Sequence, residues 1–375
     1  MKIKYRVSIP FYNREEKKNL LIAFDKNEIS GFYGSFISKF EKNFSKFSDC
    51  KYGVSVNSGT TALHLGLLSV GIKKGDEVIV STLTNMATIF AILYIGAKPV
   101  PIDIEKDSFN IDVNLIEKKI NKKTKAILVV HLFGQPVEMN IVKKIAKKYS
   151  LKIIEDCAEA HGALYKNKKV GSLGDVGCFS FYANKIISTG EGGMLTFNKK
   201  LYAEKAKNLK GLAFGKQNKF MHRDIGYNYR MSNLQSALGC AQLKKINSII
   251  KKKIFIANQY RINLKYNNII KVPAAKPNTK NVYWMICVTI KDCSHKNIKK
   301  IMEFLLKKGI ETREMFVPYN MQNFFLKQKV VFKEECPLAN AVSKNTFYLP
   351  SGVELREFEI KYISNQLLRA VQKYA

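Results

Sequence analysis

The chain has 375 residues, 46% of them hydrophobic and 25% charged, a composition that excludes a disordered chain and predicts a soluble globular protein. Its 63 Lys and Arg outnumber its 30 Asp and Glu, so the formal net charge is +33, which favours an anionic partner: nucleic acid, an anionic membrane or a phosphorylated small molecule. The length predicts one large α/β domain and a smaller second one.

The seven cysteines are scattered and include no C-x-x-C pair, so they are predicted to be reduced thiols rather than zinc ligands or a redox centre. The start of the chain has no apolar stretch typical of a signal peptide, and no apolar run is long enough to cross a bilayer. We therefore expect a cytoplasmic protein with no metal site and no membrane span.

Short β-rich runs alternate with helical patterns in the first half of the chain. The runs are apolar on both sides, which is typical of parallel strands covered by helices on each face of the sheet. The predicted strands are Val54–Val56, Val78–Val80, Pro99–Ile102, Ala126–Val130, Lys152–Glu155, Cys178–Phe181 and Met194–Phe197. The predicted helices between them are Thr61–Val70, Met86–Ile95, Val113–Ile120 and Ile141–Tyr149.

A second unit follows a long predicted helix over Ser232–Ile262. It contains a strand near Tyr283–Ile290, a Lys-rich helix near Asn297–Lys308 and a last helix near Glu357–Lys373. We predict a large domain over residues 1–245 and a small C-terminal α/β domain over residues 246–375.

The segment Asn57–Ala62 ends a predicted strand and begins a predicted helix. The free N–H groups and the positive end of the helix dipole at such a junction favour a phosphate, and Gly59 would let it approach the backbone closely. The alternative interpretation is that Ser58 or Thr60 merely caps the helix.

An acidic segment follows the strand predicted over Lys152–Glu155, and it places Asp156 at the carboxyl end of a parallel sheet. Ligands of α/β proteins bind at this edge. The alternative is that Asp156 caps the next turn and that Glu159 and His161 are ordinary surface residues.

The only lysine between Val176 and Phe197 is Lys185, and its neighbours are mostly apolar or small. Desolvation lowers the pKa of such an amine and makes it a usable nucleophile for a Schiff base. The glycine-rich run Gly190–Gly193 after it indicates a tight backbone path around a ligand. The alternative is a lysine on a surface loop whose amine reaches solvent.

These three motifs occur in order with a fourth, Asp224–Met231. Together they resemble the DegT/StrS family of pyridoxal-phosphate-dependent sugar aminotransferases, from about Ser8 to the last helix. The resemblance implies the aspartate-aminotransferase-like fold (fold type I), with a mostly parallel central sheet in the large domain and a small C-terminal α/β domain. It also implies a homodimer with shared active sites.

The resemblance assigns roles to individual residues. Lys185 would bind pyridoxal 5'-phosphate covalently and later move a proton, and Asp156 would pair with the ring nitrogen of the cofactor. The phosphate would be held by the start of the helix at Gly59 and by side chains of this chain and its partner subunit, namely Thr60, Thr61, Ser180 and, from the partner subunit, Asn228.

Two positions depart from the family pattern and two arginines are candidates for the sugar nucleotide. Asn85 stands where the family usually has an aromatic ring over the cofactor, so we expect either weaker retention of the cofactor or compensation by Met86 or another neighbour. Glu159 stands where Gln or His usually lies near the phenolic oxygen, and a carboxylate there must share a proton or face the substrate. Arg230 and Arg313 are the candidate substrate contacts, although Glu314 follows Arg313 where proline is common.

The predicted reaction passes an amino group from glutamate or glutamine, through the pyridoxamine 5'-phosphate form of the cofactor, to a nucleoside-diphosphate keto sugar. The motifs look closest to the perosamine-synthase branch, which predicts GDP-4-keto-6-deoxymannose as substrate and a place in polysaccharide synthesis such as that of an O-antigen. The net charge of +33 leaves a nucleic-acid-binding or regulatory protein as the alternative, although the sequence has no recognition-helix signature and no basic arm. A sugar dehydratase is disfavoured, because such relatives replace the reactive lysine with histidine.

Overall fold

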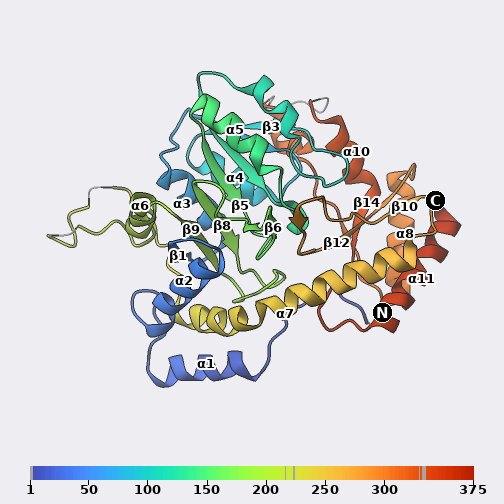
Figure 1. Cartoon of the computed structure of the whole chain (residues 1–375), viewed down its shortest axis with the longest axis horizontal. Coiled ribbons are helices and arrows are strands. Elements are labelled where there is room, and N and C mark those ends of the chain that lie inside the picture. The colour runs from blue at the N-terminus through green and yellow to red at the C-terminus, as the bar shows by residue number, and fades with distance from the viewer. Residues whose placement is uncertain (1–2, 216, 223, 329, 332–334) are drawn as a thin grey trace.

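A computed structural model of the chain describes residues 3–215, 217–222, 224–328, 330–331 and 335–375. The larger part is built around a seven-stranded sheet with the strand order β1-β9-β8-β5-β4-β2-β3 (Figure 1). Only β9 runs against the others in this sheet, since it pairs antiparallel with both β1 and β8, and the predicted mostly parallel sheet is confirmed. The strands are β1 (Tyr52–Val56), β2 (Glu77–Ser81), β3 (Lys98–Ile102), β4 (Thr124–Val130), β5 (Lys152–Asp156), β8 (Val176–Ser180) and β9 (Gly193–Phe197).

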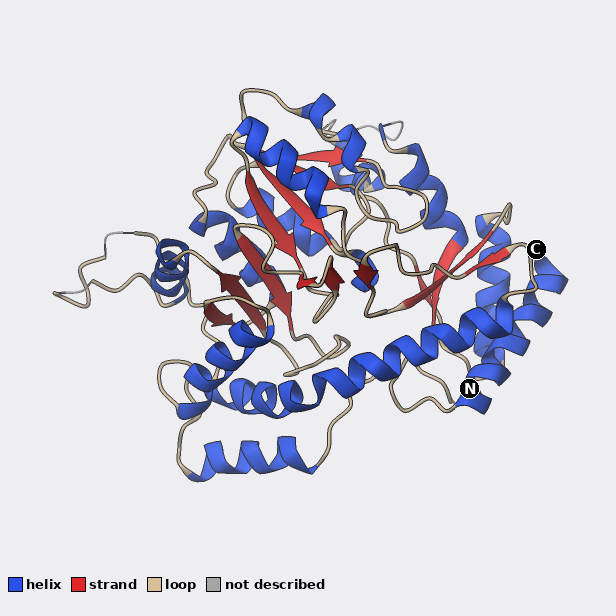
Figure 2. Ribbon diagram, viewed as in Figure 1, coloured by secondary structure: helices blue, strands red, loops and turns tan. Residues whose placement is uncertain are grey.

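Helices cover both faces of this sheet (Figure 2). Cys178 of β8 lies against Gly66 of α3, whereas the next residue, Phe179, packs against Phe44 of α2, because successive strand residues point to opposite faces. A Cβ at Gly66 would come within 2.8 Å of the Cys178 sulfur, so glycine lets α3 approach the sheet closely. The helices are α1 (Arg14–Asp25), α2 (Ser35–Phe47), α3 (Gly59–Ser69), α4 (Met86–Tyr94), α5 (Met139–Tyr149), α6 (Lys200–Lys210) and α7 (Asn233–Leu264).

The predicted helix over Val113–Ile120 is wrong. Two short 3₁₀ turns occupy this segment, η1 (Val113–Leu115) and η2 (Glu117–Lys119). The Asp112 carboxylate accepts hydrogen bonds from both the backbone and the side-chain nitrogen of Asn114, at 3.0 Å each. Such local bonds offer the backbone an alternative to the α-helix, and the segment is too short for propagation to outweigh them.

The C-terminal part contains a four-stranded sheet with the order β10-β12-β14-β13, whose apolar residues share a hydrophobic core with residues of α7, α8 and α11. A three-stranded sheet, β11-β6-β7, connects residues near 165 with residues near 280. The elements are β10 (Ile270–Lys271), β12 (Ile286–Ile290), β13 (Arg313–Glu314), β14 (Thr346–Leu349), β6 (Leu164–Tyr165), β7 (Lys168–Lys169), β11 (Thr279–Lys280), α8 (His295–Lys307), α9 (Asn323–Lys327), α10 (Pro337–Asn345), α11 (Glu357–Tyr374), η3 (Leu132–Gly134) and η4 (Tyr319–Met321).

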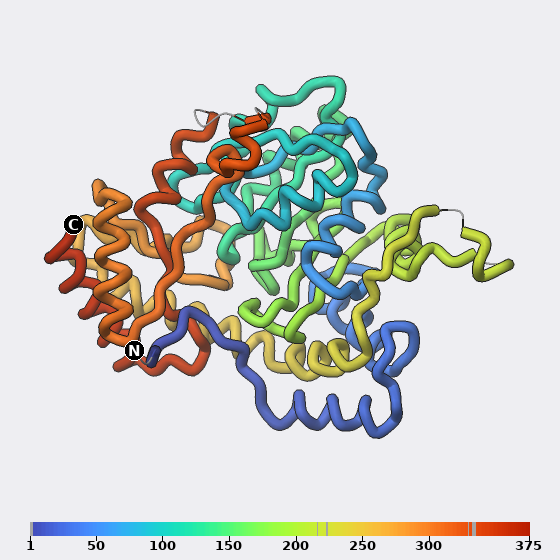
Figure 3. The backbone as a smooth tube through the Cα atoms, turned by 180° about the vertical axis from the view of Figure 1, so that it is seen from behind, coloured from blue at the N-terminus to red at the C-terminus, as the bar shows by residue number. Residues whose placement is uncertain are grey.

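Helix α7 belongs to two hydrophobic cores. Its earlier residues, such as Ile246 and Ile250, pack in the core of the large sheet, whereas Ile256 and Tyr260 pack in the core of the C-terminal sheet. The predicted domain boundary between residues 245 and 246 therefore falls inside a continuous helix. Tyr5, near the start of the chain, also belongs to the second core and forms a β-bridge with Ile310. Figure 3 shows from behind that the start of the chain lies beside the C-terminal part.

All seven cysteines are buried and none forms a disulfide. None of the helices in the described part of the chain combines the length and the apolar character needed to cross a membrane.

Candidate active site

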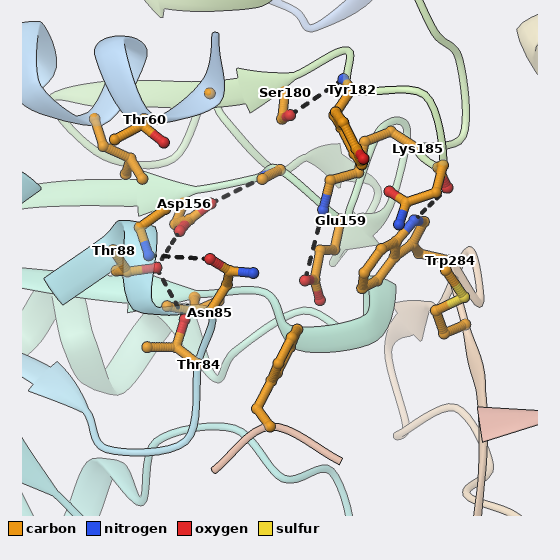
Figure 4. Close-up of a pocket in the computed structure, with 18 of the residues that line it drawn as sticks. Thr60, Thr84, Asn85, Thr88, Asp156, Glu159, Ser180, Tyr182, Lys185 and Trp284 are labelled. Carbon is orange, nitrogen blue, oxygen red and sulfur yellow. Dashed lines mark hydrogen bonds and ion pairs between the residues drawn. The ribbon is translucent and has the colours of Figure 1, made fainter. Parts of the chain in front are cut away.

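A pocket of about 400 Å³ lies at the carboxyl ends of the parallel strands (Figure 4). Its walls come from the first turns of α3 and α4, the segments that follow β5 and β8, and the C-terminal part around Trp284 and β13. The parallel arrangement predicted a ligand site at this edge. Eight of the predicted site residues line the pocket: Gly59, Thr60, Asn85, Asp156, Glu159, Ser180, Lys185 and Arg313.

The start of α3 forms one wall of the pocket. Ser58 caps the helix by accepting a hydrogen bond from the Thr61 N–H at 3.1 Å, and the Thr61 hydroxyl in turn accepts from the Ser58 N–H. Thr61 thus stabilises the helix start and does not line the pocket, whereas Gly59 and Thr60 do. The cap and the anion site are compatible, because the N–H groups of the first turn have no partner within the helix.

Asp156 ends β5 and lies at the bottom of the pocket. Its two carboxylate oxygens accept hydrogen bonds from the Thr88 hydroxyl at 2.8 Å and from the Ala158 N–H at 3.0 Å. Burial nevertheless raises the pKa of Asp156 above its usual value. A cation held against this carboxylate would oppose that shift, and a protonated ring nitrogen is such a cation.

Lys185 reaches the pocket from the segment that follows β8, and its Nζ lies 3.7 Å from Glu159 Oε1. Burial lowers the pKa of Lys185, an effect that the carboxylates of Glu159 and Asp156 partly oppose. The same Nζ lies 3.8 Å from the centroid of the Trp284 ring. Nothing in the sequence singled out Trp284 except that it is the single tryptophan of the chain, two residues before β12.

Glu159 lies beside Lys185 in the pocket, on the segment that follows β5. It is only 4% exposed, and its Oε2 accepts a hydrogen bond from the Phe133 N–H at 2.8 Å. Burial raises the pKa of Glu159 to about 7, even though Lys185 opposes the shift. Near neutral pH the carboxyl group is therefore expected in both its protonated and its ionised form.

Comparison with known proteins shows the family. Residues 12–368 match the DegT/DnrJ/EryC1/StrS aminotransferase family. The chain belongs to this family. The chain is 37% identical to the GDP-perosamine synthase of Escherichia coli O157:H7 over 358 residues, 96% of each chain, and 37% identical to that of Vibrio cholerae over 360 residues, 95% of this chain and 96% of the relative.

A solved structure agrees with this assignment. PseC of Helicobacter pylori, an aminotransferase involved in the biosynthesis of pseudoaminic acid, superposes with a TM-score of 0.92 at 28% identity, covering 99% of this chain and 100% of the other. The predicted fold type and the predicted class of enzyme, a sugar aminotransferase that uses pyridoxal 5'-phosphate, are thus confirmed. The nucleic-acid-binding alternative is not favoured.

The remaining predicted residues differ in their placement. Asn85 lines the pocket but also caps α4, since its side-chain oxygen accepts from the Ala87 N–H at 3.0 Å. Asn228 and Arg230 do not line this pocket; the Arg230 Nη2 donates to the Asn228 side-chain oxygen at 2.8 Å. Within one chain, these two residues are therefore not brought to Lys185.

A cluster of His131, Glu155 and Cys157 offers three potential metal ligands within 4.8 Å of one another. Glu155 accepts hydrogen bonds from the N–H groups of Gly171, Leu173 and Gly174, and it contacts His131 Nε2 at 3.0 Å. The other ring nitrogen of His131 accepts from the Val137 N–H at 3.1 Å. The hydrogen bonds engage the lone pairs that an ion would need, so the cluster is structural.

Gly59→Ala is expected to weaken binding of the cofactor. A Cβ at position 59 would lie 2.6 Å from the Ser180 Cβ, so Ser180 and the start of α3 must move apart. Overpacking of this kind costs about 1–3 kcal/mol, which predicts a Kd for pyridoxal 5'-phosphate roughly 10- to 100-fold higher in an absorbance titration. Gly352→Ala is the matched control, since its Cβ would meet nothing within 4 Å. A Gly59→Ala protein that binds as tightly as this control would contradict the placement of the phosphate.

Glu159→Gln should change how the stability of the cofactor-free protein depends on pH. A carboxyl whose pKa rises from 4.5 when unfolded to about 7 when folded binds more protons in the folded state, so stability falls as pH rises through this window. From pH 5 to pH 8, the wild type should lose about 2.5 kcal/mol of unfolding free energy relative to Glu159→Gln.

Urea unfolding at fixed protein concentration measures this difference. Glu16→Gln is the control, because the pKa of Glu16 is lowered from its usual 4.5. The contribution of Glu16 to stability therefore changes mainly below pH 4.5. The difference in unfolding free energy between Glu16→Gln and wild type should stay nearly constant from pH 5 to pH 8. Parallel pH profiles for Glu159→Gln and wild type would show that Glu159 is ionised throughout.

Proposed function

We propose that the chain transfers an amino group from glutamate, or glutamine, to the keto carbon of GDP-4-keto-6-deoxymannose. The observation that carries the chemistry is that the amine of Lys185, the carboxylate of Asp156 and the first turn of α3 face one pocket. An amine, a buried carboxylate and an anion-binding helix start are the three groups that pyridoxal 5'-phosphate requires.

The cofactor, when bound, acts as an electron sink for the substrate carbon that loses a proton. Asp156 stabilises positive charge on the ring nitrogen, and Thr88 holds its carboxylate in place. Gly59, Thr60 and Ser180 bind the phosphate group.

Lys185 first anchors the cofactor and, once released, moves the proton. Its freed Nζ would take the proton from the substrate carbon and pass it to the cofactor carbon to which Lys185 had been joined, which a desolvated amine of lowered pKa can do near neutral pH. Glu159, 3.7 Å away and itself titrating near pH 7, keeps a proton within reach of that amine.

The substrate assignment rests on the relatives named GDP-perosamine synthase, which match over 95% or more of this chain and of their own length. Arg313 lines the pocket, and its side chain is 43% exposed, so its guanidinium can turn from Glu311, 3.6 Å away, toward an anionic substrate. We place the enzyme in the cytoplasm, where nucleotide sugars for polysaccharides such as an O-antigen would be made.

Mass spectrometry of the products tests the substrate assignment. The purified protein is incubated with ¹⁵N-glutamate, or with glutamine labelled with ¹⁵N at its α-amino group, and with GDP-4-keto-6-deoxymannose, dTDP-4-keto-6-deoxyglucose or its 3-keto isomer. We expect ¹⁵N in a GDP-linked 4-amino-4,6-dideoxymannose. Exclusive labelling of a dTDP sugar would contradict the substrate, and no labelling in any arm would contradict the function.

We further propose a homodimer in which Asn228 and Arg230 serve the pocket of the partner subunit. Both residues lie outside the pocket of their own chain. They follow a segment with exposed apolar side chains, including Phe220 (76% exposed), Met221 (67%) and Ile225 (84%), which a second copy would bury. Sedimentation should therefore give a dimer. Asn228→Ala should weaken cofactor binding while the protein remains a dimer. A monomer that carries cofactor and is active would contradict the shared site.

A further inference from the structure

Lys253 of α7 is a buried amine outside the pocket. It is 3% exposed, and its Nζ donates hydrogen bonds to the Trp284 carbonyl at 3.0 Å and to the Ser351 hydroxyl at 3.2 Å. Among the described residues, no carboxylate forms an ion pair with it, and burial lowers the pKa of Lys253 to about 7.

Trp284, whose carbonyl accepts the hydrogen bond from Lys253, contacts the segment Asn184–Lys185 twice (Figure 4). The indole Nε1–H donates to the Asn184 carbonyl at 2.7 Å, directly before Lys185 in the chain. The face of the ring lies 3.8 Å from Lys185 Nζ. The Trp284 backbone N–H also donates to the Phe133 carbonyl at 3.0 Å, and the Phe133 N–H donates to Glu159. Trp284 therefore contacts both the segment that carries Lys185 and the segment whose Phe133 N–H holds Glu159.

Ser351, which accepts the second hydrogen bond of Lys253, also binds the N-terminal segment at Val7. Its N–H and its hydroxyl both donate to the Val7 carbonyl, at 2.8 Å and 3.2 Å. The adjacent Ser8 hydroxyl donates to the Asn184 carbonyl at 3.4 Å. Helix α7, the C-terminal part and the N-terminal segment thus meet at Lys253, and all three are connected to the residue before Lys185.

Burying an amine without a carboxylate destabilises a protein, and an apolar side chain of similar length would fill the same space. Lys253 is present in spite of this, with both of its hydrogen bonds directed at supports of the pocket. We propose that Lys253 is a positioning residue, which fixes Trp284 so that the indole face holds the Lys185 amine in place. This inference rests on the proposed function only in taking Lys185 as the reactive amine.

Trp284 is the single tryptophan of the chain, so its fluorescence reports on this site alone. The experiment is a double-mutant cycle in cofactor-free protein, with Lys185→Ala made in the wild type and in Lys253→Met. A cation over an indole face alters its emission, so Lys185→Ala should change the emission in the wild type. Lys253→Met removes one of the three hydrogen bonds that the structure gives Trp284, so the ring is held less firmly and the same change should become smaller.

Lys245→Met is the matched control, because Lys245 is also a largely buried lysine of α7 but pairs with Glu16 at 2.6 Å, away from the pocket. In this background the emission change on Lys185→Ala should persist. With cofactor loaded, Lys253→Met should lower kcat about tenfold with little change in KM for the amino donor, a loss comparable to one cation–π contact. Lys253→Gln, which keeps a donor, should recover part of both effects and replaces Lys253→Met if the latter does not fold.

An unchanged emission difference in Lys253→Met and Lys253→Gln, with kcat at the wild-type value, would overturn the positioning role. The absence of any Lys185-dependent emission change in the wild type would overturn it as well. The fluorescence cycle needs neither cofactor nor substrate. A protein that shows the coupling but transfers no amino group would therefore contradict the proposed function and leave the role of Lys253 intact.

Discussion

Lys185→Ala should lower the rate of amino transfer by about 10⁴-fold or more, because one side chain both anchors the cofactor and moves the proton. Lys185 is the only lysine among the described residues that line the pocket, so no neighbouring amine can replace it. The folded state should persist, since the substitution removes an amine whose pKa is already lowered by burial. Product formation measured by mass spectrometry gives the rate, and thermal unfolding gives the stability.

Lys245→Ala is the control for this prediction. Its side chain is 15% exposed, close to the 10% of Lys185, and it also pairs with a glutamate. This variant should unfold at a lower temperature, because Glu16 loses its partner, and should keep most of the wild-type kcat. A Lys185→Ala protein that retains more than about one hundredth of the wild-type rate would show that another group does this work.

Asp156→Asn should lower kcat by roughly 10³-fold with almost no change in the fold. Asparagine has the same shape and can still accept the hydrogen bond from Ala158, but it lacks the charge that keeps the ring nitrogen protonated. A charge pair in a partly shielded protein site is worth about 4 kcal/mol, which corresponds to roughly 10³-fold in rate. Single-turnover absorbance with glutamate would measure the loss in one half-reaction.

Asp175→Asn is the control for Asp156→Asn. Asp175 is also partly buried beside the central sheet, but it accepts from the Ile153 N–H and pairs with Lys199 at 3.3 Å, near the opposite ends of the strands. Its loss should reduce stability and leave the absorbance change with glutamate intact. Equal losses in the two variants would mean that Asp156 acts only through the fold.

The parts of the site that the sequence predicted come from single segments. Asp156 and Ser180 each end a buried strand, and Gly59 begins a helix after another, so the parallel topology alone brings them to one edge. The role of Lys185 rested on its apolar neighbours together with the family resemblance. Lys185 is buried in the structure, as its apolar neighbours in the sequence predicted.

The parts that the sequence did not predict depend on contacts between distant segments. Thr88 holds Asp156 from 68 residues away, and Trp284 binds the segment of Lys185 across 100 residues. Neither contact leaves a local pattern, because a threonine in a helix and a tryptophan before a strand are common. The failure at Val113–Ile120 has a different origin, since the Asx turn at Asp112 competes with the helix over a few residues.

The most direct test of the central claim is to find where the cofactor is attached. Borohydride reduces the carbon–nitrogen double bond between the cofactor and a lysine, so treatment of the yellow holoenzyme should fix the cofactor irreversibly. Proteolysis and mass spectrometry should then find the adduct on the peptide that contains Lys185, and no adduct should form with Lys185→Ala. An adduct on any other lysine, or none on the wild type, would contradict the assignment of this pocket as the active site.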